Sequence, residues 1–188
     1  NDGTINGSSE VDATIGKGQE FTTDGQIITV PHDTSIDLSG IDCTIRLRFS
    51  LDPIADQQKW SGLFAKGITG DPSTDELQDY ALQREGSTDD AVFYTGDAGV
   101  DQIPPPDKHF LTGLFADVAD GNTHTLSLLV NSGDPSLDVY QEDTLISELA
   151  LSNQIESHGH ELKIMNSRDP ITAFGVIDEL QIIREQLS

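Results

Sequence analysis

A regular alternation of hydrophobic and polar residues marks the clearest element of the chain. Every second residue from Ile41 to Phe49 is apolar and the residues between them are polar, which is the period of a strand with one buried face. Shorter patterns of the same kind recur at 27–30, 62–66, 80–83, 91–94, 125–130, 137–140 and 162–165. A last strand is predicted over 176–183, where both faces are apolar.

Clusters of Gly, Pro, Asp and Asn separate these segments and predict turns. Many short strands joined by turns are typical of an antiparallel two-sheet β-sandwich. No long amphipathic helix competes with this interpretation. One short helical turn is predicted from Asp71 and Pro72 toward Leu77, and Pro104–Pro106 predicts a stiff extended loop.

The charge of the chain limits its partners. Its 188 residues, enough for one well-cored domain, include 33 acidic and 10 basic residues, giving a net charge of −23. Such a chain repels phosphate backbones and anionic membranes, so nucleic-acid binding is not expected, whereas cationic partners fit. Asp (23 residues) outnumbers Glu (10 residues), which indicates acids in loops, because Asp favours turns and close oxygen coordination.

The chain has one cysteine, Cys43, so no internal disulfide can form and the fold must depend on its core, a bound metal or both. We find neither a continuous apolar stretch of about 18 residues nor a basic-then-apolar leader, so membrane insertion is not expected. Because residue 1 is Asn, we expect an excised domain of a larger multidomain polypeptide.

A series of short motifs resembles a known family in its order along the whole chain. The motifs are Asn1–Gly7, Gly16–Phe21, Ile28–Pro31 with Ser35–Leu38, Thr44–Phe49, Gly62–Gly67, Asp79–Leu82, Asp120–Thr125, and Phe174–Leu180 continuing through Leu187–Ser188. This order resembles the laminin G-like, concanavalin A-like jelly-roll domains. The segments 177–180 and 120–125 carry most of the resemblance.

The resemblance implies a single jelly-roll domain over residues 1–188. It also implies a secreted or cell-surface protein. The disulfide common in animal relatives is absent, and together with the acidity this favours a bacterial surface protein or adhesin.

Asp178 is the most informative carboxylate. Strict alternation would place it on the same face as Val176, Leu180 and Ile182, where a carboxylate needs a cation, hydrogen-bond donors or a raised pKa. The resemblance implies a structural Ca²⁺ here, held by Asp178 with backbone oxygens near Asp24 and Gly25. The alternative is a carboxylate that accepts backbone N–H groups at a β-bulge.

A second group of acids lies between Asp71 and Asp107, where ten acidic residues face a single arginine. The resemblance implies a rim Ca²⁺ that bridges to ligand, with Asp79 as one ligand and Asn166 or Asp169 as another. The alternative is an acidic rim that is only solvated.

Aromatic and polar residues in loops are candidates for sugar contacts, because sugars stack on aromatic faces and need polar groups for their hydroxyls. Trp60 and Tyr94 fit the first role, and Asp97 and Arg168 fit the second. Packing of either aromatic at the edge of the sandwich is the alternative.

No catalytic motif is found. The Glu-x-Asp-x-Glu strand pattern of sandwich glycosidases, a Gly-x-Ser-x-Gly elbow, a Walker loop and His-Glu-x-x-His are all missing from the sequence, so we expect a protein that is not an enzyme. The sequence favours a calcium-dependent module that binds a glycan or a protein segment. The alternatives are a spacer that uses Ca²⁺ only for stability and an accessory module of a polysaccharide-degrading enzyme.

Overall fold

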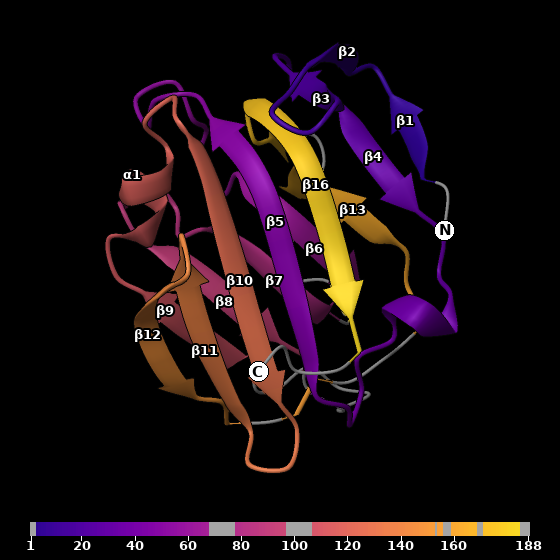
Figure 1. The fold of residues 1–188 in the computed structure, drawn as a ribbon, viewed down its shortest axis with the longest axis vertical. Helices are drawn as coiled ribbons and strands as arrows, with labels where there is room; N and C mark the ends of the chain where they lie inside the picture. Colours follow the sequence, from indigo (N-terminus) through magenta and orange to yellow (C-terminus); the bar gives the residue numbers. More distant parts are fainter. Residues whose placement is uncertain are drawn as a thin grey trace.

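The computed structural model describes residues 3–67, 78–96, 107–152, 154–155, 159–168 and 171–184. Two seven-stranded sheets pack face to face (Figure 1), which confirms the predicted antiparallel β-sandwich. We call them the β7 sheet, in the order β1-β4-β13-β6-β7-β8-β9, and the β5 sheet, in the order β12-β11-β10-β5-β16-β3-β2. A two-stranded piece, β14-β15, lies beside β6.

The strands of the β7 sheet are β1 (Thr4–Asn6), β4 (Ile27–Val30), β13 (Leu162–Ile164), β6 (Gly62–Gly67), β7 (Gln78–Arg84), β8 (Ala91–Thr95) and β9 (Asp107–Leu111). Those of the β5 sheet are β12 (Thr144–Ala150), β11 (Ser136–Gln141), β10 (Thr123–Asn131), β5 (Cys43–Leu51), β16 (Gly175–Ile183), β3 (Lys17–Phe21) and β2 (Ser9–Asp12). The remaining elements are β14 (Asn166–Arg168), β15 (Ile171–Thr172), the 3-10 turn η1 (Thr34–Ile36) and helix α1 (Leu114–Val118).

The hydrophobic core lies between the two sheets. In β5 the alternation predicted from sequence is observed, because Cys43, Ile45, Leu47 and Phe49 are fully buried. The β7 sheet is buried on both faces along β6, and a second small cluster of Ala65, Ala81, Val92 and Tyr94 lies on its outer face. Part of the outer face of the β7 sheet is therefore buried rather than exposed to solvent.

All nine strands predicted from the hydrophobic pattern are present, with ends shifted by at most two residues. Seven strands of the described chain were not predicted. Five of them, β1, β2, β3, β9 and β12, are edge or near-edge strands that lack a buried apolar stripe, and β14 and β15 have only three and two residues. Helix α1 was also missed, since five residues are too few for a helical period. Strand β13 stops before Met165, whose φ of 60° leaves the strand conformation.

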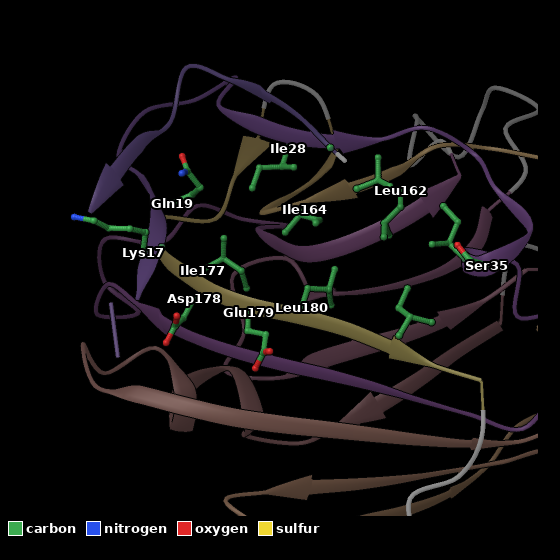
Figure 2. Close-up of a pocket in the computed structure, with 15 residues that line it drawn as sticks. Lys17, Gln19, Ile28, Ser35, Leu162, Ile164, Ile177, Asp178, Glu179 and Leu180 are labelled. Atoms are coloured by element: carbon green, nitrogen blue, oxygen red, sulfur yellow. The ribbon is translucent and has the colours of Figure 1, made fainter. Parts of the chain in front are cut away.

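A β-bulge in β16 corrects the predicted position of Asp178. The pairing with β5 shifts between Ile177 and Glu179, so Asp178 is the extra residue. Ile177 and Leu180 point toward the opposite sheet, whereas Asp178 and Glu179 point away from it (Figure 2). The prediction that Asp178 shares a face with Leu180 was wrong, because the bulge reverses the alternation.

Two predicted features, the helical turn from Asp71 to Leu77 and the loop at Pro104–Pro106, lie outside the described residues. In the part of the chain that the structure describes, no helix has the length and apolarity needed to cross a membrane.

Candidate functional site

Two aromatic rings and one lysine form a cluster on the outer face of the β7 sheet. The Lys108 ammonium nitrogen lies 5.6 Å from the centroid of the Trp60 ring and 5.6 Å from that of the Tyr94 ring. At these distances the ammonium is attracted to the negative faces of both rings. We call Trp60, Tyr94, Lys108 and their partner Glu85 the aromatic–lysine cluster.

Strand pairing places two members of the cluster. Tyr94 in β8 lies directly opposite Lys108 in β9, and their side chains therefore emerge on the same face. Trp60 comes from the turn before β6, where its backbone N–H donates to the carbonyl of Gly86 at 3.1 Å. Its φ of 65° is unusual for a bulky residue and directs the indole over Gly86, from which a Cβ atom would lie 3.6 Å from the ring.

Glu85 connects the members of the cluster. One carboxylate oxygen accepts a hydrogen bond from Lys108 Nζ at 3.1 Å, and the other accepts from the Tyr94 hydroxyl at 3.3 Å. Gln83 Nε2 donates to the same hydroxyl at 3.2 Å, while Gln83 Oε1 is buried without a hydrogen-bond partner. Burial, and secondly the charge of Glu85, raise the pKa of Tyr94, so this hydroxyl stays protonated and donates.

The structure thus brings together Trp60 and Tyr94, which are 34 residues apart in sequence. Sequence reasoning missed Lys108, Glu85 and Gln83. The acidic Glu85 was hidden among its many acidic neighbours, and Lys108 could not be paired with Tyr94 because β9 was not predicted. One signal in the sequence was the scarcity of basic residues, since Lys108 is one of only 10.

The other two predicted ligand contacts are not placed with this cluster. Asp97 lies outside the described residues. Arg168 ends β14, and its backbone pairs with Ile171, but its side chain also lies outside what the structure describes.

Asp178, the predicted calcium ligand, accepts one hydrogen bond and forms one ion pair. Its Oδ2 accepts from the N–H of Ile15 at 3.1 Å and lies 3.3 Å from Arg48 Nε. Its Oδ1 is buried and has no hydrogen-bond partner. The side chain is only 4% exposed, so an unpartnered oxygen here is costly unless a ligand satisfies it.

The surroundings of Asp178 offer oxygen ligands. A polar pocket of about 360 Å³ is lined by Asp178 and by oxygen-bearing side chains of Asp12, Thr14, Ser50 and Thr123. Carboxylate and other oxygens of this kind fit a hard cation such as Ca²⁺. The positive charge of Arg48 on Oδ2 opposes a cation, so the fit rests on Oδ1.

Asp24 and Gly25 are not brought to Asp178. They follow β3, whereas Ile15, which Asp178 contacts, precedes it. The Asp24 carboxylate instead accepts from Gln58 Nε2 at 2.5 Å and from the Thr172 N–H at 3.4 Å. The structure therefore places the turn before β3, with Ile15 and Thr14, beside Asp178.

Two of the residues predicted to bind a rim calcium, Asp79 and Asn166, are buried. Asp79 forms an ion pair with Lys66, and neither side chain is exposed. Asn166 is fully buried, and neither polar atom of its side chain has a hydrogen-bond partner. Asp169 lies outside the described residues. Within the described ranges, no group of three or more His, Cys, Asp or Glu side chains is placed to hold a metal, and the metal roles stay predictions.

A second groove, of about 380 Å³, runs between the sheets along β16. Ile28, Leu162 and Ile164 of the β7 sheet line one wall, and Ile177 and Leu180 line the other (Figure 2). The groove shows that the two sheets are incompletely filled at the end where β1 and β4 lie.

No family model matches the chain, and no curated protein matches it. Solved structures share its fold. The binding domain of Paraclostridial Mosquitocidal Protein 1 is 14% identical with a TM-score of 0.71, covering 98% of this chain and 44% of that one. The chain therefore spans less than half the length of that binding domain.

Two further structures are carbohydrate complexes. Domain 4 of AbnA, a GH43 extracellular arabinanase from Geobacillus stearothermophilus, in complex with arabinotriose, has a TM-score of 0.68 at 15% identity and covers 99% of this chain and 84% of that one. The Ruminococcus gnavus IT-sialidase CBM40 bound to alpha2,3 sialyllactose has a TM-score of 0.61 at 14% identity and covers 91% of each chain. At these low identities the similarity establishes only the fold, so the function has to be argued from the site itself.

Proposed function

We propose that this domain is a non-catalytic carbohydrate-binding module of a secreted or cell-surface protein, related to the laminin G-like jelly rolls. The observation that carries the proposal is the aromatic–lysine cluster, in which Trp60 and Tyr94 flank one ammonium group on an outer sheet face. The half-buried Trp60 ring can stack on a sugar ring, and the partly exposed Glu85 carboxylate can pair with hydroxyls.

The structural neighbours support the same proposal. The arabinanase domain and the sialidase CBM40 were each solved with an oligosaccharide, and the mosquitocidal protein neighbour is a binding domain. A chain that covers less than half of the mosquitocidal binding domain fits one module of a larger polypeptide.

We also propose that Ca²⁺ stabilises the domain through Asp178. The unpartnered Oδ1 and the polar pocket that Asp178 shares with Asp12 support this role. When bound, the ion would supply positive charge to a buried carboxylate oxygen. The chain itself holds the other oxygen, through the Ile15 N–H and the Arg48 guanidinium.

A glycan array with the full chain, with and without a calcium chelator, tests the function. We expect glycan hits that Trp60→Ala abolishes. The matched control is Tyr140→Ala, which removes a half-buried aromatic from β11 in the other sheet. Hits that survive Trp60→Ala contradict this site, and a blank array with calcium-dependent melting supports the spacer alternative.

A further inference from the structure

The face of Tyr94 within the aromatic–lysine cluster is occupied by Lys108. Tyr94 is only 5% exposed, and the Lys108 ammonium lies over its ring. The Lys108 side chain is 38% exposed and comes from β9, the edge strand of the β7 sheet. A ligand group that reaches this ring face must therefore take the position of the lysine ammonium.

Glu85 decides which chemical group can replace that ammonium. Its side chain is only 20% exposed, and Lys108 is its ion-pair partner. A neutral ligand that displaced Lys108 would leave a mostly buried carboxylate without its cation, which is strongly unfavourable. A ligand with its own ammonium group keeps both the ion pair and the cation–π contacts.

The backbone of Trp60 gives a second, independent indication of a binding site. A φ of 65° for tryptophan belongs to a sparsely populated, unfavourable conformation that persists where the surroundings enforce it. Such strain is concentrated at ligand sites. Here it holds the indole against Lys108, the group that a ligand would replace.

We propose that Trp60, Tyr94 and Glu85 form a site for the ammonium group of an amino sugar, and that Lys108 occupies this site when no ligand is bound. The inference rests on the proposed carbohydrate-binding function and names its ligand class. The net charge of −23 attracts such cationic glycans. Lys108 is a tethered competitor, because a linked group acts at a high effective concentration.

Calorimetric titration with two matched ligands tests the inference. One ligand is a glucosamine tetramer, which is cationic, and the other is the N-acetylglucosamine tetramer, which has the same backbone without the charges. We expect the glucosamine tetramer to bind at least about tenfold more tightly, since an uncompensated Glu85 costs more than about 1.4 kcal/mol. Trp60→Ala and Glu85→Gln should each weaken that binding by about tenfold or more.

Lys108→Ala gives the sharpest outcome. If Lys108 occupies the ligand's position, its removal strengthens binding of the glucosamine tetramer by about tenfold. Lys163→Ala is the charge-matched control, because Lys163 lies on β13, three strands away from the Tyr94 strand β8 in the same sheet. Circular dichroism of each variant checks that it is folded.

Three results would overturn the inference. The first is that the N-acetylated tetramer binds as tightly as the glucosamine tetramer or more tightly. The second is that Lys108→Ala binds the glucosamine tetramer more weakly than the parent does. The third is that Trp60→Ala leaves the affinity for the glucosamine tetramer unchanged, which would indicate only general charge attraction. Neutral glycans that bind through Trp60 would leave the proposed function standing while the inference fails. Failure of both the array and the glucosamine titration would reject the two together.

Discussion

Arg48 Nε lies 3.3 Å from Asp178 Oδ2, and this contact joins the bulge of β16 to the neighbouring strand β5. The same carboxylate oxygen accepts the N–H of Ile15, so three segments far apart in sequence meet at one side chain. The other oxygen is buried and unpartnered. Asp178 therefore has a structural role that needs no metal and a free oxygen that a metal can use.

Replacing Asp178 separates these two roles. We expect Asp178→Asn to destabilise the calcium-free domain by about 1–3 kcal/mol, because Arg48 loses its partner. If Asp178 also binds Ca²⁺, calcium raises the melting temperature of the parent chain but not that of the variant. Melting curves in calcium and in chelator measure both effects. Glu179→Gln, which changes the adjacent and more exposed carboxylate, is the control, and equal losses in both buffers would contradict calcium binding.

The ion pair of Lys66 and Asp79 predicts a large loss of stability when one partner is removed. Both side chains are fully buried, so Lys66→Met leaves a buried charge and should cost about 3–5 kcal/mol. The double variant Lys66→Met/Asp79→Leu should recover most of this loss, since replacing a whole buried pair by apolar residues is often neutral. Urea unfolding measures the difference, with Lys59→Met at an exposed position as control. A loss below about 1 kcal/mol for Lys66→Met would contradict the pairing.

The same residue tests the rim calcium implied by the family resemblance. Because Asp79 is neutralised by Lys66, we expect Asp79→Asn to leave the stoichiometry and affinity of calcium binding unchanged. Calorimetric calcium titration of a folded variant decides this. A lost binding site in Asp79→Asn would show that the carboxylate serves a metal as well as Lys66.

Asp120 predicts a pH dependence of stability in acid. Hydrogen bonds from Asn122 and then from His124 lower its pKa from 3.8 to about 2 in the folded chain. A lowered pKa means that the stabilisation is present above 3.8 and is lost as the pH falls toward about 2. The melting temperature of the parent should therefore fall more steeply across this window than that of Asp120→Asn. Parallel curves would contradict the prediction.

Cys43 should be inert to thiol reagents in the folded domain. It is fully buried, and burial, followed by the charge of Asp42, raises its pKa to about 12. At pH 8 roughly one thiol in ten thousand is then ionised, and only the thiolate reacts. A colorimetric thiol assay should show no reaction in native buffer and one thiol per chain in urea. Rapid reaction in native buffer would show that β5 opens locally.

The sequence by itself determined the sandwich and most of its strands. A period-two pattern such as that of β5 shows which face of the strand meets the core. This alternation involves only residues that are neighbours in sequence, so the sequence alone reveals it. The sequence also singled out Trp60, Tyr94 and Asp178, because aromatic residues near turns and a carboxylate between apolar residues stand out without any structure.

Only the tertiary structure decided what these residues contact. A bulge is a property of two paired strands, so the shift that turns Asp178 away from Leu180 is invisible in either strand alone. The aromatic–lysine cluster depends on the register that sets Tyr94 opposite Lys108 and on the turn that brings Trp60 to both. Register and turn geometry are fixed by long-range pairing, and the candidate site therefore exists only once the sheet has formed.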